Sequence, residues 1–291
     1  MSLMTSAEIY RHAEEGRYAV PGFDSYCLEV VQAQLRAANA EAAPFLLQVT
    51  PKGLRHIGMP YFAALARVVV EESRVPLGLH LDHGTTLEEI VSSIRHGFSS
   101  VMIDGSMLGF EANVALSRKV VEIAHAVGVS VEAELGRVLG KESDVEVRSG
   151  EETMTDPQAA ERFVLETGID SLAVSVGNVH GFRRGQAAID FQRLEAIHRA
   201  VPVPLVLHGG SGLGAEAFER ARQLGVRKVN IGTAIKRAFT ESLRRSCRDN
   251  PTEIDPRRVL GPAREAVVEE LKAVIRMLGA AGRSWLGAGA A

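Results

Sequence analysis

A dense group of potential metal-binding and catalytic side chains lies in the segment LGLHLDHGTT, residues 77–86. His80, Asp82 and His83 follow one another closely at the end of an apolar run. A buried strand needs none of these side chains for packing, whereas a metal site or an acid–base site is built from imidazole and carboxylate groups. The segment therefore indicates a functional site.

Two further histidines follow apolar runs later in the chain, His180 in GNVHG and His208 in VLHGGSG. With His83 they make three imidazoles, and three imidazoles with one open coordination position form a common type of catalytic zinc site. The three are far apart in sequence, so their shared position after strand-like runs is what supports the assignment. His80 is left open between simple packing and a role in supporting a ligand.

Asp82 adjoins a proposed metal ligand, so its carboxylate is a candidate for proton transfer to or from a bound substrate. The alternative is that Asp82 caps the following helix. That helix already has a capping box, however, because Thr85 or Thr86 is followed three residues later by Glu88 or Glu89.

The elements that must position these residues alternate along the whole chain. Short apolar runs occupy residues 18–23, 44–49, 77–81, 99–103, 129–135, 170–176, 204–208 and 227–231. Amphipathic stretches typical of helices occupy about 26–42, 60–74, 86–97, 112–127, 157–168, 191–200, 215–225 and 234–247. One more helix, opened by Pro262, is expected at about 262–279, and a flexible tail at about 280–291.

Eight strand–helix repeats predict an α/β protein with a (β/α)8 TIM barrel, a single domain over residues 1–291 with an extra C-terminal helix. Apolar runs without strict alternation suit parallel strands that are buried on both faces. A doubly wound sheet is the rival fold. It would show a GxGxxG turn after the first strand, and VPGFDSYCLE contains none.

In a barrel of this kind the active groups lie at the carboxyl ends of the strands. Every predicted strand is followed there by a polar side chain that could face one shared mouth. These side chains are Asp24; Thr50; Asp82 and His83; Asp104 and Ser106; Glu134; Asn178 and His180; His208 and Ser211; Asn230 and Thr233.

Two glycine-rich turns, LHGGSGLG at 207–214 and VNIGTA at 229–234, follow the seventh and eighth strands. Barrels commonly bind phosphate at this position through backbone N–H groups and a helix N-terminus. A long, charged segment from about 136 to 156 follows the fifth strand and has the length of a lid. Glu142 within it is either a base that swings into the site or part of a solvated loop.

The bulk composition narrows the possible partners. A formal net charge of −3 without a basic block argues against nucleic acid. No apolar run approaches the roughly 18–20 residues of a membrane-spanning helix, and the N-terminus lacks the pattern of a signal peptide. Two isolated cysteines, Cys27 and Cys247, suit a reducing cytoplasm.

The motifs LHLDHG, SSVMIDGS, VSVEAELG, GNVHG, VLHGGSG and KVNIGT, in this order and spacing, closely resemble those of class II (zinc-dependent) ketose-bisphosphate aldolases. The resemblance runs from about Tyr18 to about Leu271. It implies reversible cleavage of a phosphorylated ketose into dihydroxyacetone phosphate and an aldehyde. Fructose 1,6-bisphosphate is the first expected substrate and tagatose 1,6-bisphosphate the second.

By this resemblance the three histidines would hold one zinc ion per chain, with Glu134 as a carboxylate near the metal. Asp82 would move the proton of the aldehyde-derived hydroxyl, and Glu142 would take the proton from the dihydroxyacetone phosphate carbon. A bound zinc ion would polarise the ketone, so no lysine Schiff base is required. Cobalt, iron or nickel would also suit three imidazoles, and a monovalent cation is a further candidate.

The same resemblance implies a set of residues that bind the phosphate of the ketone half. Arg184, in GFRRGQ, stands where the family often has a lysine, and Asn230 would contact the oxygens of this half. The other members lie directly after His180 and in the glycine-rich turns: Gly181, Gly209, Ser211 and Thr233.

The residues expected around the aldehyde half depart from the family pattern. Asp24 stands where relatives usually have asparagine, and an ionised carboxylate cannot donate a hydrogen bond. Ala234 stands where Asp or Glu is frequent, while Thr50 is a further substrate-binding candidate. Arg257, in DPRR, resembles the arginine that reaches the site of a neighbouring subunit, so a homodimer or homotetramer is expected.

Three alternatives stay open at this stage. The departures raise the prospect of an aldolase for another sugar phosphate, such as a phospho-deoxy-ketogluconate. A barrel metal-hydrolase would usually show an HxH pair on the first strand, and AVPGFD has none. A non-catalytic sugar-phosphate binder would be expected to lose Asp82 or a metal ligand, and neither is lost.

Overall fold

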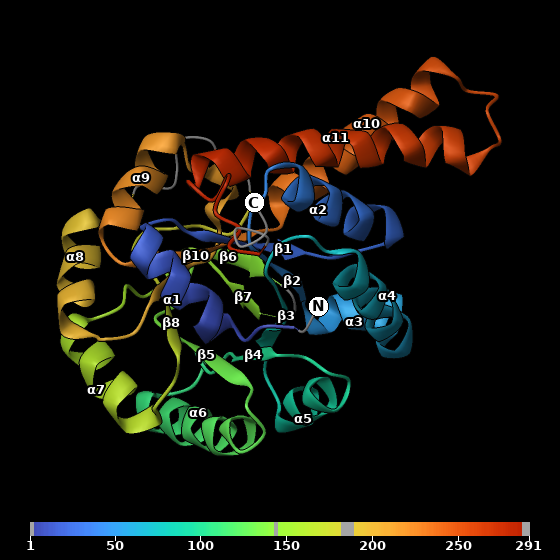
Figure 1. Ribbon diagram of the computed structural model, residues 1–291. Helices are drawn as coiled ribbons and strands as arrows, with labels where there is room; N and C mark the ends of the chain where they lie inside the picture. The colour runs from blue at the N-terminus through green and yellow to red at the C-terminus, as the bar shows by residue number, and fades with distance from the viewer. Residues whose placement is uncertain (1–2, 143–144, 182–188, 287–291) are drawn as a thin grey trace.

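Eight parallel strands form a closed barrel in the order β1-β10-β9-β8-β5-β4-β3-β2, as the computed structural model shows (Figure 1). The structure describes residues 3–142, 145–181 and 189–286. Each neighbouring pair of barrel strands is parallel, and β1 closes the barrel against β10 through Val20 and Lys228. The predicted (β/α)8 fold is confirmed.

The barrel strands coincide with the eight apolar runs of the sequence. All eight residues of β3 are buried, which is why the runs do not alternate between apolar and polar. The strands are β1 (Val20–Asp24), β2 (Phe45–Val49), β3 (Leu77–Gly84), β4 (Ser100–Ile103), β5 (Ser130–Leu135), β8 (Ser171–Val174), β9 (Leu205–Leu207) and β10 (Val226–Ile231). A separate antiparallel hairpin, β6 (Gly140–Glu142) and β7 (Val145–Val147), lies within the segment predicted as a long loop.

Helices follow each barrel strand and form the outer layer (Figure 1). They are α2 (Leu28–Ala40), α4 (Met59–Glu72), α5 (Leu87–Arg95), α6 (Phe110–His125), α7 (Pro157–Thr167), α8 (Phe191–Ala200), α9 (Ala215–Gln223), α10 (Thr233–Asp249) and α11 (Pro256–Met277). Two further helices, the short α3 (Pro51–Ile57) and the N-terminal α1 (Ser6–Gly16), were not predicted from the sequence. A capping box of Thr5 and Glu8 starts α1, and this sequence pattern could have predicted the beginning of the helix.

Helix α1 lies across the amino-terminal end of the barrel (Figure 1). The N–H of Ala7 donates to the hydroxyl of Ser130 at 3.2 Å, and the hydroxyl of Ser100 donates to that of Ser6 at 2.8 Å. Ser100 and Ser130 are the first residues of β4 and β5, so α1 closes this end. Substrate must therefore enter at the opposite end, where the strands have their carboxyl termini.

The C-terminal helix begins six residues earlier than predicted. Asp255 caps α11 by accepting from the N–H of Arg257, and Pro256 occupies the first turn, where a missing N–H costs nothing. Pro262 lies inside the helix rather than at its start. Burial of Leu271 and other apolar residues of α11 against the core offsets the hydrogen bond that Pro262 removes.

Part of the expected flexible tail is packed against the barrel. The N–H of Gly282 donates to the carbonyl of Glu41 at 2.7 Å, and that of Ser284 to Ala42 at 2.8 Å. The ring of Trp285 stacks on His12, with 3.9 Å between ring centroids. Two backbone hydrogen bonds and an aromatic anchor therefore hold residues 280–286, within the segment predicted as a flexible tail, against the rest of the chain; residues 287–291 lie outside the described part of the chain.

Candidate metal centre and active site

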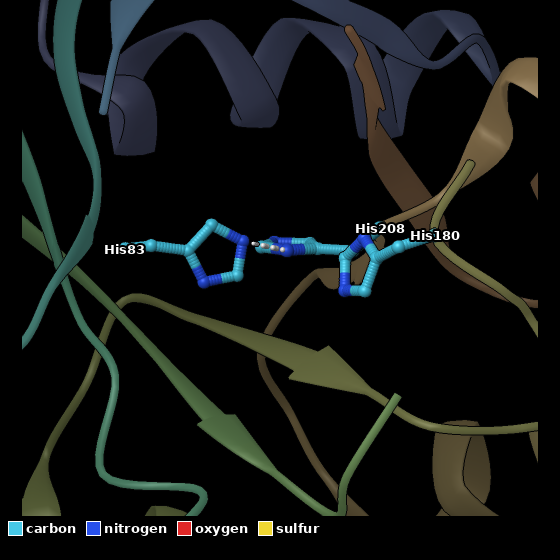
Figure 2. A group of neighbouring side chains, drawn as sticks. All are labelled: His83, His180 and His208. Atoms are coloured by element: carbon cyan, nitrogen blue, oxygen red, sulfur yellow. Dashed lines mark hydrogen bonds between the residues drawn. The ribbon is translucent and has the colours of Figure 1, made fainter. Parts of the chain in front are cut away.

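Three histidines from three different strands converge at the carboxyl end of the barrel. His83 lies in β3, His180 follows β8 and His208 follows β9 directly. Their candidate ligand nitrogens all lie within 4.8 Å of one another, and all three side chains are buried. Figure 2 shows the rings directed toward one another from separate segments. The structure thus brings together the trio that the sequence predicts as metal ligands.

Carboxylates fix the orientation of two of these rings. Nδ1 of His83 lies 2.8 Å from Oδ2 of Asp104, and Nε2 of His208 lies 3.0 Å from Oε1 of Glu132. A ring nitrogen that faces a carboxylate carries the proton, which leaves the other nitrogen with its lone pair. We therefore assign lone pairs to Nε2 of His83 and Nδ1 of His208, the two nitrogens that face each other.

These two inward nitrogens lie 2.8 Å apart. Two lone pairs at that distance repel unless a proton or a metal cation lies between them. Burial, and next repulsion from His83 whenever that ring is protonated, lower the pKa of His208, which favours the neutral imidazole that metals bind. The donor set, with Oε2 of Glu134 3.7 Å from Nδ1 of His208, therefore fits a divalent metal ion.

An irregularity in β3 lets two adjacent residues face the same site. Successive side chains of a regular strand point to opposite faces. Here the pairing of β3 with β4 shifts between Leu81 and Gly84, and His83 has a φ of 51°, in the left-handed region. Bulges and positive φ values at non-glycine residues concentrate at functional sites. The irregularity places Nε2 of His83 3.9 Å from Oδ2 of Asp82.

Asp104 is held as a carboxylate although it is buried. Burial raises its pKa, but the hydrogen bond and charge of His83 and two hydrogen bonds from Ser106 lower it to about 2 overall. The N–H and the hydroxyl of Ser106 both donate to Oδ1, at 3.0 and 2.7 Å. Asp104 and Ser106 were predicted at the mouth only as strand-end polar groups, and their support of His83 emerges from the structure.

We expect Asp104→Asn to weaken metal binding by about 10- to 100-fold, the range typical for carboxylates that orient a metal-bound histidine. The amide keeps an acceptor for Nδ1 of His83 but removes the negative charge. Competition with a chelator of known affinity measures the change, and Asp249→Asn on the exposed end of α10 is the control. Equal affinity in both variants would remove Asp104 from the metal site.

Asp82 is fully buried beside the metal centre. Its Oδ1 accepts from Nδ2 of Asn230 at 2.9 Å, and its Oδ2 accepts from Nε2 of Gln48 at 3.2 Å. The helix-cap alternative is wrong, because Thr86 caps α5 in a capping box with Glu89. The two amides hold the Asp82 carboxylate in a fixed orientation, as a proton-transfer group requires.

A buried ammonium group lies beneath this site and was missed by the sequence analysis. Nζ of Lys228 donates to Oε2 of Glu132 at 2.8 Å and lies 3.1 Å from Nε2 of His80. Burial raises the pKa of Glu132, but the charge of Lys228 and the hydrogen bond from His208 together lower it by more. The pKa of Glu132 is therefore lowered overall, and this carboxylate stays ionised. Lys228 lies two residues before Asn230 in β10, so the two side chains point to the same side of the strand. This spacing is the feature of the sequence that could have predicted Lys228 beneath the site.

His80 packs beside Lys228, beneath the site, and its two ring nitrogens face Ser100 and Lys228 instead of a proposed metal ligand. Its Nδ1 lies 2.8 Å from the hydroxyl of Ser100 and its Nε2 faces Lys228. Burial and then Lys228 lower the pKa of His80, so the ring is neutral. The structure thus favours the packing alternative, although His80 and Asp82 share a side of β3 as predicted, 3.9 Å apart.

The two glycine-rich turns come together beside the metal centre. The hydroxyl of Ser211 accepts from the N–H of Ala234 at 3.2 Å, which joins the turn after β9 to the first turn of α10. Thr233 begins α10, and Gly209 has a φ of 67° and space for no Cβ against Val179. A glycine-lined helix N-terminus of this kind is suited to bind phosphate. Gly181, with a φ of 93°, follows the metal-centre histidine of the β8 loop.

Other predicted residues lie apart from the centre or outside the description. The hydroxyl of Thr50 caps α3 by accepting from Gly53. Arg257 is the second residue of α11, at the outer end of the arm that α10 and α11 form (Figure 1), and its side chain is 89% exposed. Arg184 lies outside the described residues.

Glu142 ends strand β6, and its side chain lies outside the description. The hairpin is anchored at the metal centre, because the N–H of His180 donates to the carbonyl of Leu139 at 2.8 Å. Gly140, with a φ of 115°, packs directly against His180. Glu142 is two residues beyond Gly140 in β6, so its backbone lies on the same side of the barrel mouth as His180.

Fold and site together define a metal-dependent barrel enzyme, and comparison with known proteins identifies the family. The family model described as fructose-bisphosphate aldolase class-II matches residues 4–283. A fructose-bisphosphate aldolase of Thermus caldophilus is 41% identical over 308 aligned positions, which cover 97% of this chain and 100% of the relative. The chain belongs to the class II fructose-bisphosphate aldolase family, and it is an aldehyde-lyase of a metal-dependent class.

Solved structures agree with this assignment. The YdjI aldolase from Escherichia coli K12 superimposes with a TM-score of 0.84 at 28% identity, covering 97% of this chain and 99% of that one. A protein of Coccidioides immitis assigned as a fructose-1,6-biphosphate aldolase gives a TM-score of 0.86 at 30% identity, with 96% and 97% coverage. Among the described helices, none has both the length and the apolar composition to cross a membrane.

Proposed function

We propose that the protein is a zinc-dependent aldolase that reversibly cleaves a phosphorylated ketose into dihydroxyacetone phosphate and an aldehyde. The observation that carries the proposal is the convergence of three histidines, two of them oriented by carboxylates, beside the buried Asp82. Fructose 1,6-bisphosphate is the first candidate substrate, supported by the name of the Thermus caldophilus relative. Tagatose 1,6-bisphosphate is the second.

The residues divide the work between the two halves of the substrate. The turns around Ser211 and Thr233 would bind the phosphate of the ketone half through backbone N–H groups. Asp82 would take the proton from the hydroxyl of the aldehyde half as the carbon–carbon bond breaks, and Glu142 would return a proton to the ketone-half carbon. The three histidines would hold a zinc ion, which would supply Lewis-acid stabilisation of the negative charge on the ketone oxygen.

An aldolase for another sugar phosphate is the second candidate function, and Asp24 is the observation that favours it. Both of its oxygens accept protein hydrogen bonds, from the hydroxyl of Tyr26 at 2.8 Å and from Gln48 at 2.7 Å. Asp24 therefore presents a negatively charged acceptor where a neutral hydrogen-bond donor is usual in the family. The part of the aldehyde half that contacts Asp24 must be able to lie beside a carboxylate.

We further propose that the active form is a homodimer or homotetramer in the cytoplasm. The support is the α10–α11 arm, which projects from the barrel (Figure 1), together with Arg257, the second residue of α11, whose side chain is exposed. An arm of this kind gives an exposed arginine access to a neighbouring subunit. The free cysteines, Cys27 and Cys247, are consistent with a reducing compartment.

Exchange of a dihydroxyacetone phosphate proton with solvent, without any aldehyde, tests the ketone-half chemistry. We expect the native enzyme to catalyse this exchange and a chelator to abolish it. Glu142→Ala should slow it by roughly 100-fold or more, because the proton-transfer group is lost. Glu146→Ala, in the same hairpin, is the control. An unchanged rate in Glu142→Ala would assign Glu142 to the solvated surface of the hairpin.

A further inference from the structure

Lys228 is the cation shared by two buried carboxylates beneath the metal centre. Its side chain is fully buried, and its Nζ lies 2.8 Å from Oε2 of Glu132 and 3.8 Å from Oδ1 of Asp82. Within the described part of the chain, no other lysine or arginine forms an ion pair with either carboxylate. Burying an ammonium group costs free energy that ion pairing does not reliably return, so stability alone is a weak reason for a lysine at this position.

The packing of His80 directs this ammonium group. The hydroxyl of Ser100 donates its proton to Ser6 at 2.8 Å, so toward Nδ1 of His80, at 2.8 Å, it is the acceptor. The proton of the neutral His80 ring therefore lies on Nδ1, and Nε2 carries the lone pair. Nζ of Lys228 donates to this Nε2 at 3.1 Å and to Oε2 of Glu132 at 2.8 Å. Two acceptors thus fix the direction in which Lys228 points.

Glu132 connects Lys228 to a proposed metal ligand. Its Oε2 is held by Lys228, which leaves Oε1 to accept from Nε2 of His208 at 3.0 Å. That hydrogen bond keeps the proton on Nε2 of His208 and the lone pair on Nδ1, which faces His83. A continuous chain of buried hydrogen bonds therefore runs from Lys228 through Glu132 to the ring that would bind the metal.

A purely electrostatic action of Lys228 on the metal would have the opposite sign. An ammonium group repels a nearby divalent cation, so a lysine that acted only through its charge would weaken metal binding. A lysine that acts through Glu132 strengthens metal binding, because it holds the acceptor that orients His208. The two accounts thus differ in the direction in which the metal affinity changes when Lys228 is replaced.

We propose that Lys228 is a positioning residue of the metal centre, which holds Glu132 so that His208 presents Nδ1 to the metal. This inference rests on the zinc site of the proposed function and adds a residue that is neither a ligand nor a proton-transfer group. Lys228 acts on the metal only through Glu132, so its effect requires the Glu132 carboxylate.

The zinc affinity of Lys228→Met, measured by competition with a chelator, tests the sign of the effect. We expect the dissociation constant to rise by roughly tenfold or more, within the range for groups that orient a metal-bound histidine. Leu271→Ala, on the buried face of α11, is the control for lost stability and should keep the native constant. Each variant is measured under conditions in which circular dichroism shows it to be folded. A constant at or below the native value in Lys228→Met would overturn the proposal.

The visible absorption of bound Co²⁺ gives a second readout, because it reports the geometry of the metal ligands. The spectrum of Lys228→Met should differ from that of the native protein, since the ring of His208 is no longer held in one orientation. Leu271→Ala should keep the native spectrum. A native spectrum in Lys228→Met would show that Lys228 does not position the ligand.

His80→Phe tests the same chain of hydrogen bonds without removing a charge. Phenylalanine fills a similar buried space but removes the acceptor that directs Lys228, so the zinc dissociation constant should rise by about threefold or more. Glu132→Gln should raise this constant by roughly 10- to 100-fold, and adding Lys228→Met or His80→Phe to it should cause little further change, because effects through one shared group do not add. Additive effects would contradict an action through Glu132.

The two proposals fail in distinguishable ways. A native protein that binds no zinc contradicts the zinc centre of the proposed function. A native protein that binds zinc, with the affinity unchanged in both Lys228→Met and His80→Phe, contradicts only the positioning role of Lys228.

Discussion

Asp82→Asn should retain the metal and lose roughly 10²- to 10⁴-fold in kcat for ketose cleavage, the usual contribution of a positioned general acid or base. The carboxylate is fully buried and held by Gln48 and Asn230 beside the three histidines. An amide at this position keeps the size of the side chain but cannot take a proton from the substrate hydroxyl.

Two measurements on the same preparation check this expectation. The metal content per chain should match the native protein, since Asp82 approaches His83 only to 3.9 Å. The rate of dihydroxyacetone phosphate release should be lower at saturating substrate, so that the loss lies in kcat rather than in KM. A variant that keeps more than a tenth of the native kcat would exclude Asp82 as the proton-transfer group.

Lys228→Met should lower the free energy of unfolding by about 3–5 kcal/mol, the range for removing one partner of a buried ion pair. Lys228 is fully buried, and its Nζ lies 2.8 Å from Oε2 of Glu132 and 3.8 Å from Oδ1 of Asp82. Methionine fills a similar volume but leaves two buried carboxylates without their cation. Urea unfolding monitored by circular dichroism measures the loss.

Matched variants separate this charge effect from packing. Lys119→Met on the surface should change the unfolding free energy by no more than about 0.5 kcal/mol. Adding Glu132→Gln to Lys228→Met should recover part of the stability, because one of the uncompensated charges is removed. A Lys228→Met variant within about 1 kcal/mol of the native protein would show that solvent or protonation compensates these carboxylates.

The barrel was predictable because its strands are buried on both faces. Burial of this kind produces apolar runs such as LGLHL and PLVLH, and eight of these runs alternating with amphipathic helices leave few other folds. The rule that active groups lie at the carboxyl ends of barrel strands then predicts that His83, His180 and His208 share one mouth. The structure brings these three together.

The supporting layer of the site was harder to predict because it depends on geometry between strands. Glu132 and Lys228 lie within two different strands, and no local pattern shows that they meet. The left-handed conformation of His83 is likewise imposed by the shift in register against β4. The sequence predicts a helix start at Pro262 because proline is usual in the first turn of a helix, whereas packing of α11 overrides this local preference and places Pro262 inside the helix.

Release of dihydroxyacetone phosphate from phosphorylated ketoses, with and without a strong chelator, tests the central claim most directly. Fructose 1,6-bisphosphate and tagatose 1,6-bisphosphate are compared with a phospho-deoxy-ketogluconate on protein of known metal content. We expect release from at least one of these sugars, its loss on removal of the metal, and its return when zinc is restored. No release from any sugar by the zinc-loaded protein, or release that persists without metal, would contradict the account.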